Sequence, residues 1–125
     1  MKRLIMDLDN TISKNITGNY AEATPVTEVI EKMRKYKDLG FEIVIFSSRN
    51  MRTYEGNIGK INANTLPIMI EWLNKYNVPY DEIHVGKVWC GNEGFYVDDR
   101  AVRPREFSNM SYDELNEIMK RDKLW

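Results

Sequence analysis

A chain of 125 residues, with 42% hydrophobic and 30% charged side chains, is long enough for one packed core and predicts a single domain over residues 1–125. Its 18 basic and 19 acidic side chains leave a net charge of −1, which argues against a nucleic-acid partner and against an acidic membrane surface. The single cysteine, Cys90, excludes an internal disulfide. No apolar run is long enough for a membrane span or a signal peptide, so we expect a cytoplasmic protein with no membrane partner.

The first third of the sequence predicts two buried strands with a helix between them. Residues 3–7 (RLIMD) and 41–46 (FEIVIF) are short apolar runs of the kind that form interior strands. Thr24 and Pro25 resemble a helix start with proline in the first turn, and Gly40 is placed to end that helix.

The remaining sequence continues this alternation. A second helix is expected near Thr65, short strands are expected at 82–85 (EIHV) and 94–98 (GFYVD), and Ser111 with Glu114 forms a capping box for a last helix. The order predicts an α/β fold, a Rossmann-like three-layer sandwich in which helices flank a mostly parallel sheet.

Polar side chains follow every predicted strand at its carboxyl end, where ligands bind in sheets of this kind. These side chains are Asp7, Asp9 and Thr11; Ser47, Ser48 and Arg49; Lys87; and Asp98 and Asp99. Carboxylates, hydroxyls and a lysine brought together suit a phosphoryl group and a hard cation such as magnesium.

The stretches that carry these side chains resemble, in the same order, the four motifs of the haloacid dehalogenase superfamily. DLDNT resembles the first motif, IVIFSSR the second, VGKVWCG the third and GFYVDD the fourth. The longer stretches SSRNMRTYEGNIGKINANTLP and GKVWCGNEGFYVDDRAVRP are similar to small phosphatases of bacterial capsule or surface-polysaccharide biosynthesis. Because the gaps between the motifs hold little beyond a helix and a loop, the resemblance implies a haloacid dehalogenase-like core with no cap domain.

The resemblance implies catalytic roles for four residues. Asp7 would be the nucleophile that forms an aspartyl-phosphate. Asp9 would protonate the leaving oxygen and then deprotonate the attacking water. Ser47 would bind a phosphoryl oxygen, and Lys87 would offset the charge of the nucleophile and the phosphate.

The resemblance also implies a magnesium ion, Mg²⁺, as cofactor. Its ligands would be the Asp7 carboxylate, the Asp9 backbone carbonyl and Asp98, with Asp99 bound directly or through water.

Five further residues are candidates for substrate binding. Thr11 would support the turn after the first strand, Ser48 and Arg49 would line the phosphate pocket, and Arg52 and Lys60 would contact an anionic group of the substrate. A structural salt bridge is the alternative role of Arg49. The loops at 15–23 and 50–60 are expected to shape specificity.

These expectations define a magnesium-dependent phosphatase that hydrolyses a small phosphorylated metabolite, a sugar phosphate or an amino-alcohol phosphate for capsule or surface-polysaccharide biosynthesis. A polynucleotide or protein phosphatase of the same superfamily stays open, because an uncapped core admits a large substrate. A non-catalytic, receiver-like phosphoacceptor domain is a second alternative, although receivers place the acid pair first and the hydroxyl and lysine last. A homo-oligomer also stays open.

Overall fold

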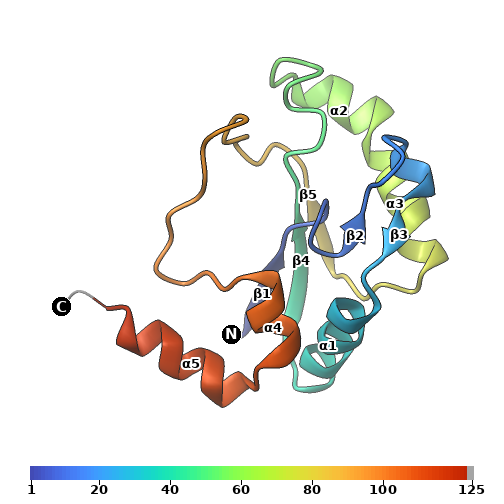
Figure 1. The fold of residues 1–125 in the computed structure, drawn as a ribbon. Coiled ribbons are helices and arrows are strands. Elements are labelled where there is room, and N and C mark those ends of the chain that lie inside the picture. Colours follow the sequence, from blue (N-terminus) through green and yellow to red (C-terminus); the bar gives the residue numbers. More distant parts are fainter. Residues whose placement is uncertain (124–125) are drawn as a thin grey trace. The chain divides into compact units, whose positions relative to one another are not determined.

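The computed structural model describes residues 1–123, which form two compact units, one ending at Trp89 and the other beginning at Cys90. The first unit contains β1 (Arg3–Met6), β2 (Ser13–Lys14), the 3₁₀ turn η1 (Tyr20–Glu22), β3 (Thr24–Pro25), α1 (Thr27–Asp38), β4 (Glu42–Phe46), α2 (Ile58–Asn64), α3 (Leu66–Lys75) and β5 (Glu82–His84). The second unit contains α4 (Pro104–Asn109) and α5 (Tyr112–Arg121) (Figure 1).

The core of the first unit is a parallel sheet of three strands in the order β1-β4-β5, with β4 in the middle (Figure 1). Met6 pairs with Ile45, and Phe46 pairs with His84, so all three strands end at the same edge. The central residues of β4 are buried, as interior parallel strands require. The three predicted strands at 3–7, 41–46 and 82–85 are therefore confirmed, and so is the α/β class; the larger three-layer sandwich stays a prediction.

Ion pairs brace the opposite edge of this sheet, where the strands begin. The carboxylate of Asp81 accepts the backbone N–H of Ile43 at 2.8 Å and the ammonium of Lys37 at 2.7 Å, and these bonds lower the Asp81 pKa below its usual value. Arg3 in β1 donates to Glu82 in β5 at 2.8 Å and lowers the Glu82 pKa in the same way.

The segment between β1 and α1 differs from the expectation. Thr24 and Pro25 do not begin the helix: they form β3, which pairs antiparallel with β2, and α1 begins at Thr27. The Val26 N–H donates to the Ile12 carbonyl at 2.8 Å, so the chain stays extended until it has passed the loop after β1. Proline fixes φ at a value that both a helix start and an extended strand accept, and its presence alone could not decide between them.

The helix near Thr65 is confirmed as α3, but it is preceded by a helix that the sequence did not predict. Part of the expected specificity loop, from Ile58 onward, belongs to α2, where the Asn57 side chain caps the Lys60 N–H at 3.1 Å.

The second unit confirms one prediction and corrects another. Ser111 and Glu114 cap the start of α5 reciprocally, as the capping box predicted. Residues 94–98 do not form a strand, although their composition favours one. Phe95 is 80% exposed and Val97 is 88% exposed, and among the described residues no strand pairs with this stretch. None of the described helices is both long and apolar enough to cross a bilayer.

Candidate functional site

The loop that follows β1 sets the positions of Asp7 and Asp9. Leu8, between them, is fully buried, and its carbonyl accepts the Ile12 N–H at 2.9 Å. Asn10 makes the turn possible because it adopts a φ of 63°, a left-handed conformation that asparagine tolerates. Asp7 and Asp9, on either side of the buried Leu8, are both partly exposed.

The carboxylate of Asp7 lies between a hydroxyl and an ammonium group. The Thr11 hydroxyl donates to Asp7 Oδ2 at 2.8 Å, and Lys87 Nζ lies 3.6 Å from Asp7 Oδ1. The Asp7 side chain remains 35% exposed, so it is open to a ligand while being held in place. Residues distant in sequence, at the ends of β1 and β5, therefore meet as the motif order predicted.

Ser47 joins the ends of β4 and β5. Its backbone N–H donates to the His84 carbonyl at 3.0 Å, and its carbonyl accepts the Lys87 N–H at 3.1 Å. The buried Ser47 hydroxyl accepts the Arg49 N–H at 3.0 Å, and this leaves the hydroxyl proton available for donation to an anion. Ser48 supplies its carbonyl to the next turn, where it accepts the Met51 N–H, and a contact of Ser48 with substrate stays a prediction.

The carboxylate of Asp9 is paired with Arg49 through both oxygens. Arg49 Nη2 lies 2.7 Å from Asp9 Oδ1, and Arg49 Nε lies 3.1 Å from Asp9 Oδ2. The ring of Tyr20, in η1, covers the guanidinium at 4.1 Å from its centroid. Arg49 therefore forms a salt bridge, the alternative role expected from the sequence, and a direct contact of Arg49 with substrate stays a prediction. Nothing in the sequence singled out Tyr20 beyond its place in the loop at 15–23.

The other two candidates for substrate binding, Arg52 and Lys60, are exposed and belong to the first unit. The guanidinium of Arg52 lies 5.6 Å from the centroid of Trp89, itself 39% exposed. Lys60 lies in the first turn of α2.

The candidate metal ligands are divided between the two units. Asp98 and Asp99 belong to the second unit, where both are exposed and Asp98 Oδ1 accepts the Arg100 N–H at 2.8 Å. Within residues 1–123, no three His, Cys, Asp or Glu side chains form a cluster ready to hold a metal ion. The role of Asp98 and Asp99 in metal binding therefore stays a prediction.

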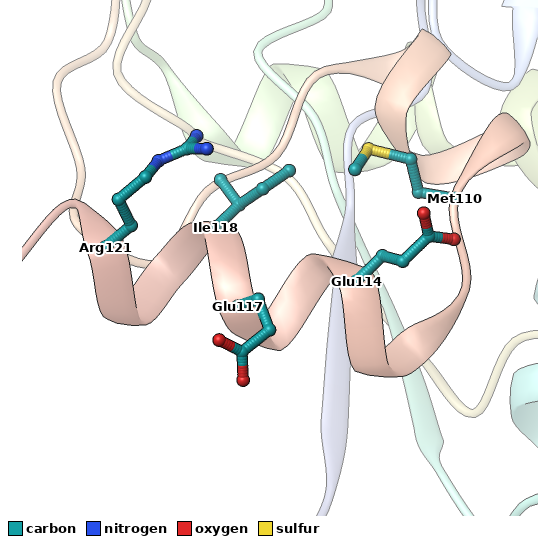
Figure 2. A pocket seen from close by; sticks show the side chains of 5 residues that line it. All are labelled: Met110, Glu114, Glu117, Ile118 and Arg121. Carbon is teal, nitrogen blue, oxygen red and sulfur yellow. The ribbon is translucent and has the colours of Figure 1, made fainter.

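A surface hollow in the second unit is lined by Met110, Glu114, Glu117, Ile118 and Arg121. Figure 2 shows Glu117 pointing away from Ile118 and Arg121, so the charged groups of this hollow do not converge on one point. It contains none of the predicted site residues.

The sequence matches no family model and no curated protein. The crystal structure of an MCSG target from Vibrio cholerae is 58% identical to this chain with a TM-score of 0.97, and the match covers 98% of this chain and 100% of that one. The chain therefore belongs to the same family as that Vibrio cholerae protein. A chain from the structure of a Pnkp1/Rnl/Hen1 complex has a TM-score of 0.52 at 22% identity, over 86% of this chain and 34% of that one, a likeness of fold alone.

Proposed function

We propose that this chain, a member of the family of the Vibrio cholerae protein, is a magnesium-dependent phosphatase with an uncapped haloacid dehalogenase-like core. It hydrolyses a phosphomonoester through an aspartyl-phosphate on Asp7. One observation carries the proposal: the Asp7 carboxylate lies 2.8 Å from the Thr11 hydroxyl and 3.6 Å from the Lys87 ammonium, at an edge where parallel strands end.

The first half of the reaction transfers the phosphoryl group to the protein. An oxygen of Asp7 attacks phosphorus, the bond from phosphorus to the leaving oxygen breaks, and Asp9 donates a proton to that oxygen. Lys87 offsets the negative charge gathered around Asp7, and the Ser47 hydroxyl donates to a phosphoryl oxygen.

The second half releases inorganic phosphate. Asp9, now ionised, takes a proton from a water molecule, whose oxygen attacks phosphorus and breaks its bond to Asp7. Both carboxylates then return to their starting states.

The donor chemistry at Asp7 fits magnesium. A half-exposed carboxylate and the Asp9 backbone carbonyl, two residues on, are oxygen donors of the kind this ion prefers, and Asp98 and Asp99 would add carboxylates. The bound ion would reduce the repulsion between an anionic phosphoryl group and Asp7.

The substrate we propose is a sugar phosphate or an amino-alcohol phosphate used in capsule or surface-polysaccharide biosynthesis in the cytoplasm, with Arg52 and Lys60 contacting an anionic group. A polynucleotide phosphatase is the second candidate. The exposed Trp89 beside Arg52 favours it, because an aromatic ring and a cation suit a nucleobase and its phosphate.

Turnover on a substrate panel tests the proposal. The panel comprises p-nitrophenyl phosphate, sugar phosphates, amino-alcohol phosphates, nucleotides and 3′-phosphorylated oligonucleotides, each with and without magnesium. We expect many turnovers per protein with magnesium, none for Asp7→Asn, and wild-type rates for Asp38→Asn, a matched change on the exposed end of α1. Phosphorylation that stops after one event would instead indicate a receiver-like domain, and wild-type rates from a folded Asp7→Asn variant would overturn the assignment.

A further inference from the structure

The guanidinium of Arg49 is almost entirely removed from solvent, with 1% of the side chain exposed, whereas its partner Asp9 keeps 24%. Arginine is rarely buried in this way unless it is paired. Its Nε and Nη2 atoms hold the two oxygens of Asp9, and the Tyr20 ring covers it. Within residues 1–123, the remaining nitrogen, Nη1, is buried with no acceptor in reach, which costs free energy that a smaller residue would avoid.

The backbone that carries Arg49 is held as firmly as its side chain. The Arg49 N–H donates to the Ser47 hydroxyl, and the next residue, Asn50, adopts a φ of 61° and accepts a hydrogen bond from the buried Thr65 hydroxyl at 2.7 Å. The loop then closes on itself through the Gly56 N–H, which donates to the Met51 carbonyl at 2.9 Å. One braced loop therefore fixes both the predicted phosphate contact at Ser47 and the arginine that holds Asp9.

From this geometry we infer that Arg49 is a positioning residue for Asp9 and not a ligand of the substrate, an inference that rests on the proposed acid and base role of Asp9. A two-point contact with a planar guanidinium fixes both the plane and the rotamer of a carboxylate. Each Asp9 oxygen keeps a lone pair directed away from Arg49, and these lone pairs are the ones that exchange protons with the leaving group and water. Arg49 thereby orients Asp9 without blocking it.

The inference makes a distinctive kinetic prediction, because proton donation matters most for poor leaving groups. Arg49→Met is expected to lower kcat about 10²-fold on an alkyl phosphate, the low end of what general acid catalysis contributes. On p-nitrophenyl phosphate, whose leaving group needs no proton, the loss is expected to be no more than a few-fold. KM is expected to change little, and Arg49→Lys is expected not to restore kcat, because an ammonium lacks the planar fork of two separate N–H donors that fixes the plane of the carboxylate. Arg34→Met is the matched control, since the Arg34 guanidinium is exposed and donates to the backbone carbonyls of Tyr76 and Asn77, away from Asp9.

A double-mutant cycle keeps the test valid if Arg49→Met is less stable. With Asp9→Asn already present, adding Arg49→Met is expected to cost little further activity, because both changes remove the same function. An equal loss on both substrates, a rise in KM with kcat unchanged, or full rescue by Arg49→Lys would overturn the inference in favour of a structural or substrate-binding arginine.

A readout without magnesium or turnover separates this inference from the proposed function. In the metal-free protein, the Arg49 Nε–H is expected to give a solvent-protected signal in a ¹⁵N correlation spectrum. That signal is expected to move and lose protection in Asp9→Ala, but not in the control Asp38→Asn. If the Arg49 signal does not change in Asp9→Ala, the inference is overturned even if the protein proves to be a phosphatase. If the signal changes as expected but the protein shows no turnover, the pairing of Arg49 with Asp9 is supported and only the proposed phosphatase reaction is refuted.

Discussion

Replacing Lys87 by methionine removes one positive charge from beside the proposed nucleophile while keeping a side chain of similar length. In the structure, Lys87 Nζ lies 3.6 Å from Asp7 Oδ1, with 21% of the lysine side chain and 35% of the aspartate side chain exposed. At such a distance, two unit charges near a protein surface attract by about 4 kcal/mol at an effective dielectric constant of about 20. The partial exposure of both side chains reduces that figure, because solvent and salt screen the pair.

The charge matters more once a phosphoryl group adds its own negative charge beside Asp7. Removing one preorganised donor from a developing anion typically costs about 3 to 4 kcal/mol, so Lys87→Met is expected to lower kcat by about 10²-fold or more. Steady-state kinetics on p-nitrophenyl phosphate with saturating magnesium measure the effect, and circular dichroism checks the fold. Lys35→Met, on the exposed surface of α1, is the matched control and should behave as wild type. A folded Lys87→Met variant with more than a third of the wild-type kcat would refute the electrostatic role.

Two other predictions concern metal binding and stability. Asp98→Ala is expected to raise the magnesium concentration needed for half-maximal activity at least tenfold, because a charged ligand is lost; an unchanged magnesium titration would exclude Asp98 from the metal site. Asp81→Asn is expected to lower the free energy of unfolding at pH 7 by about 1 kcal/mol. The neutral amide of the variant binds the Ile43 N–H and the Lys37 ammonium more weakly than the carboxylate does. Because the pKa of Asp81 is lowered by folding, its contribution is complete above the usual value of 3.8 and is lost as the pH falls further, so urea unfolding should show the variant and wild type converging at low pH. A difference that persists unchanged into strong acid would contradict this reasoning.

The parts of the fold that local sequence determines were predictable. The capping box at Ser111 and Glu114 involves residues three apart, and the apolar run at 41–46 has the density of an interior strand, so both predictions needed only a few neighbouring residues. The helix α2 was missed because IGKINAN has few apolar residues, and the capping side chain of Asn57 was its one local signal. The strand predicted at 94–98 was wrong for the opposite reason. The composition of this stretch favours a strand, but a strand forms only where another strand pairs with it.

The candidate site also has parts that the sequence could predict and parts that it could not. Parallel strands end at a common edge, so the motif order was enough to predict that Asp7 and Lys87 would meet. The pairing of Asp9 with Arg49 joins residues 40 positions apart, and it depends on how two loops fold and which way each side chain turns. No pattern of spacing encodes that direction. The packing of the Tyr20 ring on the Arg49 guanidinium was also unpredictable, because an aromatic residue in a polar loop has many possible partners.

Chemical trapping tests the central claim, that the Asp7 carboxylate accepts the phosphoryl group, most directly. The protein is mixed with substrate and magnesium, quenched within the first turnover and treated with borohydride, which reduces an acyl phosphate to an alcohol. Peptide mass spectrometry is then expected to find homoserine in place of Asp7, dependent on substrate and absent from Asp7→Asn. Homoserine at Asp9 instead, or an unmodified Asp7 in protein that is turning over under the same conditions, would contradict the account.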